Sequence, residues 1–349
     1  MLLSVEIEKK LGNFHLQTQF DLQESPLALL GASGCGKSLT LRCIAGILTP
    51  DSGKIILNGK TLYDSAAHVN LPPQVRHIGY LFQQYALFPN MTVRQNIEAA
   101  IADKHLRNAI VNEKLRQFHL ESLADRHPSQ LSGGQQQRTA LARILASSPE
   151  AILLDEPLSA LDSYLRYQLE LELSEVLDQF SGPVIWVTHD RGEAFRNCRK
   201  VCVLENGRSQ DITSLDSLVS APATEAAARL SGCQNFSDAT AKGNALFLPQ
   251  WNLTLHSSAV IPHTVTRVGL RAHHLHPDPS GFPCHVIRVI EDIFSTIVLL
   301  QPDNALPDAP PLRMELSKSA WQAVPDHHHL SVSINFSDIL LLESKGASL

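Results

Sequence analysis

The chain has 349 residues, of which 44% are hydrophobic and 18% are charged. A length of about two domains and this ordinary composition exclude a disordered chain, a collagen-like fibre and a small disulfide scaffold. Acidic residues outnumber basic ones by 35 to 29, for a net charge of −6 at pH 7, which weighs against a nucleic-acid-binding protein.

The N-terminus and the cysteines indicate a protein of the cytoplasm. The first ten residues lack the basic-then-apolar order of a signal peptide. No run of about 20 apolar residues, the length that crosses a bilayer, occurs in the sequence. The six cysteines contain no CxxC pair, which favours free thiols in a reducing compartment.

Short apolar runs alternate with helical stretches over residues 1–220. The expected strands lie at residues 27–30, 55–57, 78–82, 152–154, 184–188 and 201–204, and the expected helices include residues 39–48 and 164–180. Near-continuous apolar strands separated by helices are typical of a parallel sheet covered on both faces. The sequence therefore predicts an α/β domain over residues 1–220, with a mostly helical subdomain inserted at about residues 86–148.

The pattern changes near residue 220. Eleven of the 20 prolines follow that position, and helical periodicity fades. Short β-like runs lie at residues 265–270, 284–289, 296–300, 312–316, 330–334 and 339–342. Strands at even spacing, with Pro, Gly and Asn between them, predict a small β-barrel or sandwich over residues 221–349. We place the domain boundary between residues 206 and 230.

A phosphate-binding loop follows the first of the expected parallel strands. The segment Gly31-Ala-Ser-Gly-Cys-Gly36-Lys37-Ser38 fits the pattern GxxxxGK(S/T), and it opens the expected helix. Its backbone N–H groups would converge on phosphate oxygens, while Lys37 would contact the β- and γ-phosphates and the Ser38 hydroxyl would bind Mg²⁺. The residues expected to bind ATP are Gly31, Ala32, Ser33, Gly34, Cys35, Gly36, Lys37, Ser38 and Leu39.

Two carboxylates end a later buried strand. Asp155 and Glu156 follow the apolar run at residues 152–154. A strand tip beside the phosphate loop is where a carboxylate can hold Mg²⁺, which suits Asp155. Glu156 would then polarise an attacking water as a general base.

Residues 131–135, Leu-Ser-Gly-Gly-Gln, precede a helical stretch and predict a second anion site. An ordinary helix cap is the alternative. Two such sites in one chain could close on one nucleotide, or one could serve a partner chain, and the spacing does not decide between these arrangements. The residues concerned are Ser132, Gly133, Gly134 and Gln135.

Six motifs in order resemble those of the ATP-binding subunits of ABC transporters. They are residues 31–38, Gln83 in Tyr80-Leu-Phe-Gln83, residues 131–135, residues 152–156, Ser159-Ala-Leu-Asp162 and Thr188-His189-Asp190. The resemblance spans roughly residues 1–220 and implies the fold of a P-loop ABC ATPase.

The resemblance also implies how the site works. Two copies would sandwich two ATP molecules head to tail, with the residues from Ser132 to Gln135 of one copy facing the γ-phosphate held by the other. Gln83 resembles the glutamine that senses Mg²⁺ and the attacking water, and His189 resembles the histidine at the γ-phosphate. Asp162 resembles the aspartate that couples the two sites across the dimer. Catalysis would thus use Glu156, His189 and Gln83, and Mg²⁺ would use Ser38, Gln83 and Asp155.

The adenine contact departs from the family pattern. Many members stack the adenine on a Tyr or Trp near the end of the first strand. This chain offers Phe14, with Leu11 before it. Stacking on the base and packing in the core are equally compatible with a Phe at this position.

Residues 221–349 resemble the small β-barrel (OB-like, TOBE/Mop-type) appended to the ATPases of binding-protein-dependent importers, on the run Val268-Gly-Leu-Arg271-Ala-His-His and the final strands. This implies a homodimer attached peripherally to the cytoplasmic face of the inner membrane. Its partners would be two transmembrane permease subunits, which contact Leu87 and Phe88, and indirectly an extracytoplasmic solute-binding protein.

The transported solute is predicted from weaker features. The segments Glu8-Lys-Lys-Leu-Gly-Asn-Phe14 and Asn70-Leu-Pro-Pro73 look most like the molybdate/sulfate group. Ser231 and Asn235 lie in a stretch that resembles oxyanion-binding barrels, where small donors suit a dianion, and a polar turn is the alternative. We expect import of an oxyanion, molybdate before sulfate, with iron(III), sugar or polyamine import as the alternative. A soluble non-transport ABC ATPase fits the sequence less well.

Overall fold

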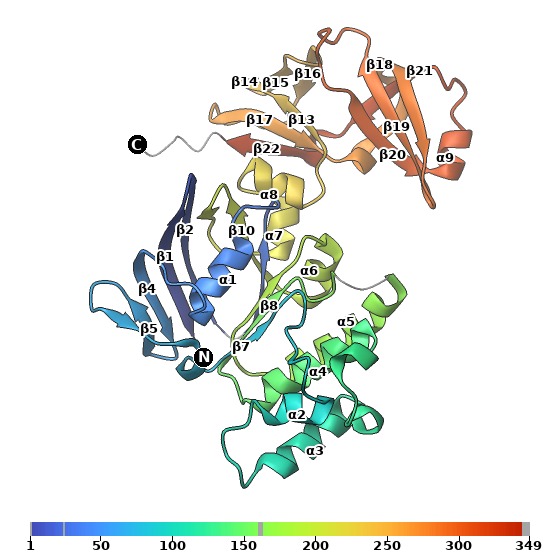
Figure 1. Ribbon diagram of the computed structural model, residues 1–349. Coiled ribbons are helices and arrows are strands. Elements are labelled where there is room, and N and C mark those ends of the chain that lie inside the picture. Colours follow the sequence, from blue (N-terminus) through green and yellow to red (C-terminus); the bar gives the residue numbers. More distant parts are fainter. Residues whose placement is uncertain (1, 24, 160–162, 344–349) are drawn as a thin grey trace. The chain divides into compact units, whose positions relative to one another are not determined.

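The computed structural model describes residues 2–23, 25–159 and 163–343. The chain forms two compact units, Met1–Leu215 and Asp216–Leu349 (Figure 1). None of the helices in the described ranges combines the length and the hydropathy that a membrane-spanning helix needs.

The first unit is built on one large sheet, in which the described strands follow the order β6-β5-β4-β1-β2-β11-β10-β3-β9-β8-β7. Its parallel part consists of β3 (Pro26–Leu30), β7 (Ile78–Leu81), β8 (Ala151–Asp155), β9 (Val184–Val187) and β10 (Lys200–Glu205). These strands confirm five of the expected ones to within one residue at either end. Every residue of β8 and β9 is buried, as in a strand covered on both faces.

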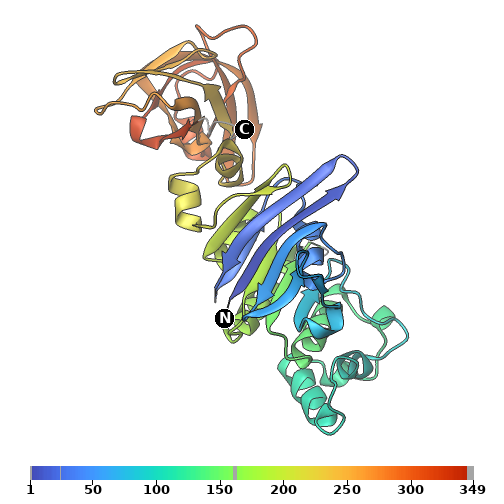
Figure 2. The ribbon, with the colours of Figure 1, turned by 90° about the vertical axis from the view of Figure 1, so that its left-hand side faces the viewer.

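The rest of this sheet is mainly antiparallel, which the sequence analysis did not foresee; the exception is the short parallel pairing of β11 with β2. It contains β1 (Leu3–Leu11), β2 (Phe14–Leu22), β4 (Ser52–Leu57), β5 (Lys60–Asp64) and β6 (Val69–Asn70), with the short strands β11 (Arg208–Ser209) and β12 (Thr213–Ser214). The strand expected at residues 55–57 is therefore not parallel, because β4 pairs antiparallel with β1 and β5. Figure 2 shows β1 and β2 side by side.

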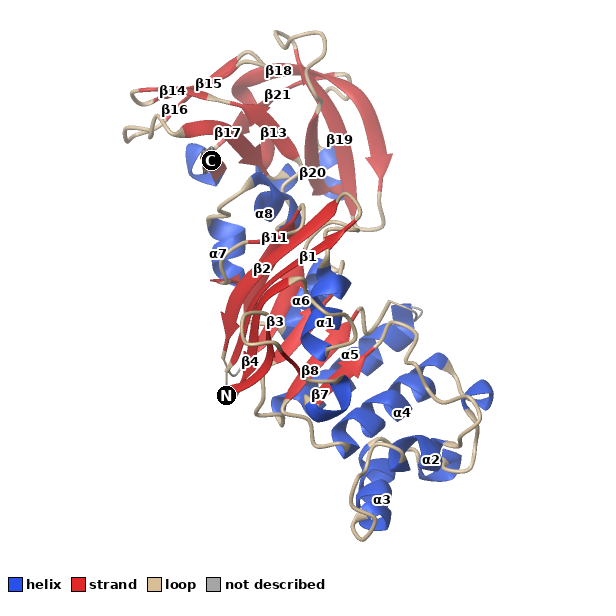
Figure 3. Ribbon diagram, turned by 60° about the vertical axis from the view of Figure 1, so that its left-hand side comes forward, coloured by secondary structure: helices blue, strands red, loops and turns tan. Residues whose placement is uncertain are grey.

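Helices of the first unit fall into two groups. Helix α1 (Lys37–Ala45) contacts β7 and β8, and α5 (Ser163–Asp178) and α6 (Arg191–Asn197) follow β8 and β9 in the chain. Between β7 and β8 lie α2 (Val93–Glu98), α3 (Arg107–Gln117) and α4 (Gly133–Ala146), with the short 3₁₀ helices η2 (Glu121–Leu123) and η3 (Pro128–Gln130) in the loops between α3 and α4. A further 3₁₀ helix, η1 (Pro73–Val75), precedes β7. Helices α2, α3 and α4 pack on one another away from the antiparallel strands (Figure 3). They occupy the region expected to be helical, residues 86–148.

Arg76 determines where α1 ends. Its guanidinium is buried and donates to the backbone oxygens of Cys43 at 3.0 Å and Ile44 at 2.8 Å, which are among the carbonyls that a helix leaves unpaired at its last turn. Gly46 follows in the left-handed conformation (φ +79°), and a Cβ there would lie 2.5 Å from Arg76 Nε. Arg76 and Gly46 thus close the helix that carries Lys37 and Ser38 on its first turn.

The strand order brings the predicted motifs to one edge of the sheet. Strands β3, β9, β8 and β7 are successive neighbours and run parallel, so their carboxyl ends lie together. The phosphate loop follows β3, Asp155 ends β8, and His189 and Gln83 follow β9 and β7 by two residues each. This edge is the usual ligand site of open α/β sheets.

The second unit is predominantly β-structure. Its elements are α7 (Leu215–Ser220, which begins at the unit boundary), α8 (Glu225–Leu230), β13 (Asn235–Asp238), β14 (Thr240–Lys242), β15 (Ala245–Leu248), β16 (Leu253–His256), β17 (Val265–Leu270), η4 (Ala272–His274), β18 (Leu275–Glu291), β19 (Ser295–Pro302), β20 (Leu312–Ser317), α9 (Lys318–Gln322), β21 (His329–Ile334), η5 (Phe336–Asp338) and β22 (Ile339–Glu343).

Three sheets surround one apolar core in this unit. Their orders are β13-β17-β22, β14-β15-β16 and β20-β19-β18-β21, and all three contribute side chains to a core that includes the fully buried Trp251. The six strands expected here are all present, and β13 to β16 were missed. The β-rich character is confirmed, and the OB-like type stays a prediction.

Candidate nucleotide-binding site

The loop between β3 and α1 is shaped to expose backbone N–H groups. Gly36 is the N-cap of α1 and has a φ of +108°, a conformation that L side chains rarely adopt. No side chain caps the first turn of α1, so its N–H groups point out of the helix without a side-chain acceptor. These N–H groups, with the positive end of the helix dipole, form a binding surface for an anion.

Lys37 bonds to its own loop. Its Nζ donates to the carbonyl oxygen of Gly31 at 2.8 Å and to that of Ala32 at 3.1 Å, and it lies 3.9 Å from the Cys35 sulfur. The side chain is largely buried, so the ammonium group is held at a defined position beside the N-terminus of α1. A held cation there adds to the attraction for phosphate.

Ser38 and Asp155 form the oxygen-rich part of the site. The Ser38 hydroxyl donates to Asp155 Oδ1 at 2.7 Å, and the Tyr80 hydroxyl donates to Asp155 Oδ2 at 2.8 Å. Burial and the Asp155 carboxylate raise the pKa of Tyr80, so this phenol remains a donor. A hydroxyl and a carboxylate are ligands that Mg²⁺ prefers, and a magnesium ion on nucleotide phosphates needs few protein ligands besides these. The donor set therefore fits Mg²⁺.

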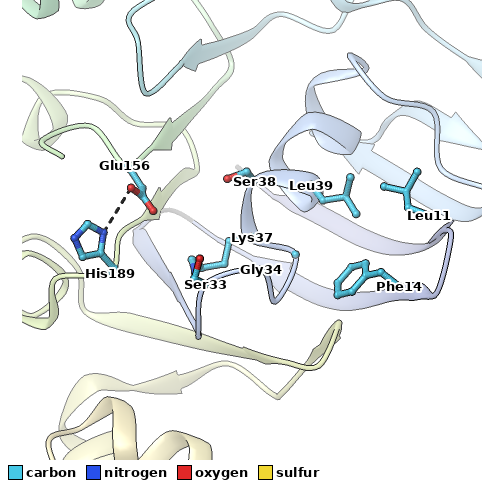
Figure 4. A pocket seen from close by; sticks show the side chains of 10 residues that line it. Leu11, Phe14, Ser33, Gly34, Lys37, Ser38, Leu39, Glu156 and His189 are labelled. Atoms are coloured by element: carbon cyan, nitrogen blue, oxygen red, sulfur yellow. Dashed lines mark ion pairs between the residues drawn. The ribbon is translucent and has the colours of Figure 1, made fainter. Parts of the chain in front are cut away.

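Glu156, His189 and Gln83 lie within reach of one another. Glu156 Oε2 is 3.5 Å from His189 Nδ1 (Figure 4) and 3.4 Å from Gln83 Nε2. The Gln83 amide also reaches Ser159 Oγ at 3.4 Å. Glu156 has a positive φ of 49°, which is rare for a side chain of this kind and turns the chain sharply at the tip of β8. The sequence-predicted catalytic residues are thus brought together.

A pocket of about 630 Å³ joins the phosphate loop to Glu156 and His189; Gln83 and Asp155 are not among its lining residues. Its lining residues are Leu11, Phe14, Ser33, Gly34, Gly36, Lys37, Ser38, Leu39, Glu156 and His189. Figure 4 shows Phe14 and Leu11 at one end, Glu156 and His189 at the other, and the phosphate loop between them. Phe14 also packs against the core of the first unit. The residue therefore lines the pocket and contacts the core, so neither of the two roles considered for it is excluded.

Several predicted residues do not line this pocket. Gly31 and Ala32 face Lys37 with their carbonyl oxygens, and Cys35 is buried behind the loop. Ser132 is instead the N-cap of α4, where it accepts from Gln135 N at 3.4 Å and its own N–H donates to Gln135 Oε1 at 3.0 Å. Gly133 and Gly134 form the first turn of that helix, and Asp162 lies outside the described residues.

Two residues near the site escaped the sequence analysis. Tyr80 was noted only as part of the motif that ends in Gln83. Glu193 lies on α6 with 3% of its surface exposed, and it accepts from the Thr188 hydroxyl at 2.6 Å. That hydroxyl accepts in turn from Asp190 N at 3.0 Å, so Glu193 supports the turn that carries His189. The Thr-His-Asp segment at the start of a helix was the available signal, because an N-cap turn needs its polar groups paired.

The segment after Gln83 contains an exposed aromatic residue. Phe88 has 47% of its surface exposed, and the Arg143 guanidinium lies 5.1 Å from the centre of its ring. Arg143 also donates to the Tyr85 carbonyl oxygen at 3.2 Å, so α4 supports the segment that contains Leu87 and Phe88.

The proposed oxyanion residues of the second unit are engaged elsewhere. Asn235 is buried and bonds to the backbone of Arg313 through both ends of its amide. The Ser231 hydroxyl donates to the Ala228 carbonyl oxygen and accepts from Arg271. Among the described residues these two side chains do not form an open anion site together, because each one closes a local contact.

The phosphate loop, the two strand-end carboxylates and the sheet order define a P-loop ATPase domain. The family model described as "ABC transporter" matches residues 17–159. The sulfate/thiosulfate import ATP-binding protein CysA of Caulobacter vibrioides is 36% identical over 330 residues, which cover 91% of this chain and 92% of that relative. The chain belongs to the family of ATP-binding subunits of ABC importers. Proteins of this family hydrolyse ATP and couple the reaction to transport.

Two other comparisons cover the first part of the chain. The spermidine/putrescine import ATP-binding protein PotA of Oleidesulfovibrio alaskensis is 43% identical over 218 residues, or 61% of this chain and 57% of that relative. The dimeric structure of a post-hydrolysis state of the ATP-binding cassette MJ0796, bound to ADP and Pi, matches 62% of this chain and 99% of its own with 29% identity and a TM-score of 0.51. The first unit therefore has the ABC ATPase fold.

Proposed function

We propose that the chain binds MgATP in the pocket between Phe14 and Glu156 and hydrolyses it to drive import of an inorganic oxyanion. Lys37 and the N–H groups at the start of α1 would bind the phosphates, and Ser38, Asp155 and Gln83 would hold Mg²⁺. When bound, this ion would neutralise charge that develops on the phosphate oxygens.

Glu156 is the proposed general base. Its carboxylate would accept a proton from the attacking water, while Gln83 orients that water and His189 contacts the γ-phosphate. The short separations of Glu156 from His189 and Gln83 support this assignment. Phe14 would stack on the adenine, because it is the aromatic ring of the pocket lining.

We further propose that two copies act together. Residues Ser132, Gly133, Gly134 and Gln135 begin α4 apart from the pocket lining, which suits a role at the nucleotide of a second copy. Asp162 would couple the two sites. The dimeric state named for the MJ0796 structure supports this proposal. Two permease subunits would dock near Leu87 and Phe88, holding the protein peripherally at the cytoplasmic face of the membrane, and an extracytoplasmic solute-binding protein would act through them.

The proposed domains are a nucleotide-binding domain at residues 1–220, with the helical subdomain at about 86–148, and a regulatory domain at residues 221–349. For the second we propose an OB-like barrel of the TOBE/Mop type, supported by three sheets that all contribute side chains to one apolar cluster. An oxyanion bound there would have to use groups other than the paired amide of Asn235.

The oxyanion is proposed to be sulfate or thiosulfate, with molybdate next. The observation that carries this is the length of the CysA match, which extends through the second unit, whereas the PotA match ends after 218 residues. Polyamine import is the second candidate, supported by the 43% identity of the PotA match, and iron(III) or sugar import is a further alternative.

Nucleotide binding is tested with Lys37→Ala and a matched control, Lys54→Ala, which removes a surface lysine that pairs with Asp64. We expect the first variant alone to lose binding of a fluorescent ATP analogue. The solute is tested by deleting the gene in its host and measuring uptake of labelled sulfate, molybdate, putrescine and iron(III). Loss of sulfate uptake alone supports the proposal, and loss of putrescine uptake alone contradicts it.

A further inference from the structure

The Asp155 carboxylate is held at both of its oxygens. Ser38, on α1, donates to Oδ1, and Tyr80, on β7, donates to Oδ2 at 2.8 Å. Asp155 itself ends β8 and has 6% of its surface exposed. A carboxylate that accepts two bonds from opposite sides cannot exchange its oxygens without breaking both bonds.

The position of Tyr80 is set by its strand and its neighbours. In the β7–β8 pairing Tyr80 lies opposite Leu153, two residues before Asp155. Its ring centre lies 4.3 Å from that of Phe82, which follows on the same face of the strand. The tyrosine is buried and its hydroxyl donates to Asp155 Oδ2, so its phenol has a fixed direction.

Which oxygen of Asp155 bonds to Tyr80 and which bonds to Ser38 matters for the binding of a metal ion. Mg²⁺ requires near-octahedral geometry at short distances and tolerates little misplacement of a ligand oxygen. Partners that hold a ligand without touching the metal commonly change metal affinity by about 10- to 100-fold when they are removed. Tyr80 occupies Oδ2 and thereby leaves Oδ1 as the oxygen directed at Ser38.

We propose that Tyr80 is a positioning residue of the magnesium site, whose hydroxyl orients Asp155 so that Oδ1 and the Ser38 hydroxyl act on one ion. The inference rests on the proposed MgATP function. The inference adds Tyr80, a residue of β7, to the residues of the magnesium site. Strand β7 would then both hold Asp155, through Tyr80, and lead into Gln83, the proposed water-sensing glutamine.

The test compares Tyr80→Phe with Tyr63→Phe. Tyr63 is a matched control because it is buried in the same unit and its hydroxyl also makes one bond of 2.8 Å, to the Pro50 carbonyl oxygen, away from the pocket. Binding of a fluorescent ATP analogue is measured without divalent cation and then as MgCl₂ is titrated, and the affinity for Mn²⁺ with ATP is measured by electron paramagnetic resonance.

For Tyr80→Phe we expect the half-saturating Mg²⁺ concentration and the Mn²⁺ dissociation constant to rise about tenfold. Metal-free nucleotide affinity should stay within about twofold, and Tyr63→Phe should match the wild type in all three. An unchanged metal dependence in Tyr80→Phe, or an equal change in both variants, overturns the inference. A wild type that binds nucleotide with no metal dependence overturns the proposed function instead.

A double-mutant comparison checks that Tyr80 acts through Asp155. If it does, Tyr80→Phe has no further effect on metal affinity in an Asp155→Asn background, since the oriented ligand is already lost. Independent, additive losses in the double variant would mean that the tyrosine acts by another route. Thermal unfolding of each variant separates these results from a general loss of structure.

Discussion

Asn235 and Arg313 are joined by a closed pair of hydrogen bonds. Asn235 Nδ2 donates to the Arg313 carbonyl oxygen at 2.9 Å, and Asn235 Oδ1 accepts from the Arg313 N–H at 2.7 Å. The side chain has 3% of its surface exposed. Because β13 and β20 belong to different sheets, this amide acts as a backbone-like link between two of the three sheets of the second unit.

Asn235→Ala should destabilise the second unit by about 2 kcal/mol, because it leaves a partly buried N–H and carbonyl of Arg313 without the partners that Asn235 supplies. Urea unfolding followed by tryptophan fluorescence measures this loss. Gln234→Ala, which truncates the exposed neighbouring amide, is the control and should be near neutral. Equal stability of the two variants would show that the paired bonds contribute nothing.

Glu156→Gln should retain ATP binding and lose at least about 100-fold in turnover, because an amide cannot accept the proton of the attacking water. Steady-state phosphate release and equilibrium nucleotide binding provide the two measurements. The matched control is Glu150→Gln, at a carboxylate beside β8 that bonds to Asn58 rather than to the pocket residues. Undiminished turnover in Glu156→Gln would remove this residue from its role.

Phe14→Ala should weaken ATP binding about tenfold, the effect of losing one base–aromatic stacking contact of about 1–3 kcal/mol. Binding of inorganic triphosphate, which has no base, should change little. Phe14→Trp should restore ATP affinity. If ATP and triphosphate lose affinity equally in the alanine variant, Phe14 shapes the phosphate loop through its contact near Gly36 and does not stack on the base.

Thiol reagents should block nucleotide binding through Cys35, which lies in the phosphate loop beside Lys37. All six thiols are buried, Cys35 included, so we expect labelling to be slow. Burial also raises the pKa of Cys43, Cys198, Cys202, Cys233 and Cys284 to about 11 or 12, so these five hold little thiolate at neutral pH. Treatment with N-ethylmaleimide should abolish ATP binding in the wild type and spare Cys35→Ser. Equal inactivation of Cys35→Ser would place the sensitive thiol elsewhere.

Glu193 should make the stability of the first unit depend on pH. Burial raises the pKa of its carboxyl above the ordinary 4.5, although the Thr188 hydroxyl acts in the opposite direction. The folded state then holds the proton more tightly than the unfolded chain, so the stabilising contribution is full below pH 4.5 and is lost as pH rises through the folded pKa.

Glu193→Gln removes this titration. The free energy of unfolding of the wild type, relative to that of the variant, should therefore fall as the pH rises above 4.5. Urea unfolding is followed by tryptophan fluorescence with Trp251 and Trp321 of the second unit replaced by Phe in both proteins, so that the buried Trp186 reports on the first unit. A difference between the two proteins that does not change with pH would contradict the prediction.

Most of the nucleotide site could be predicted because its signals are local in sequence. The phosphate loop is a continuous pattern whose geometry follows from Gly36 and the helix start, and Asp155 and His189 each follow a buried strand. The β1–β2 hairpin was missed although Leu3, Val5 and Ile7 are buried at alternate positions, which is the period of a strand with one buried face.

Contacts between distant segments could not be predicted from the pattern. Tyr80 meets Asp155 only because β7 and β8 are neighbours in a particular register. Asn235 looked like an available donor because nothing in the sequence places Arg313 beside it. The proposed role of Ser132 involves a second copy of the chain, which a single sequence does not describe.

The contact between Gly46 and Arg76 at the end of α1 limits which substitutions these two positions can accept. A guanidinium at position 76 fills the space that any side chain at position 46 would occupy, with its Nε 2.5 Å from where a Cβ would stand. Arg76 Nη1 donates to the carbonyl oxygens of both Cys43 and Ile44, while Nε and Nη2 donate to Leu71 and Asn70. Lysine has no planar set of donors that could replace these bonds. Positions 46 and 76 are 30 residues apart in the sequence. We nevertheless expect them to change together or not at all among descendants of this chain, because a substitution at one is tolerated only with a change at the other.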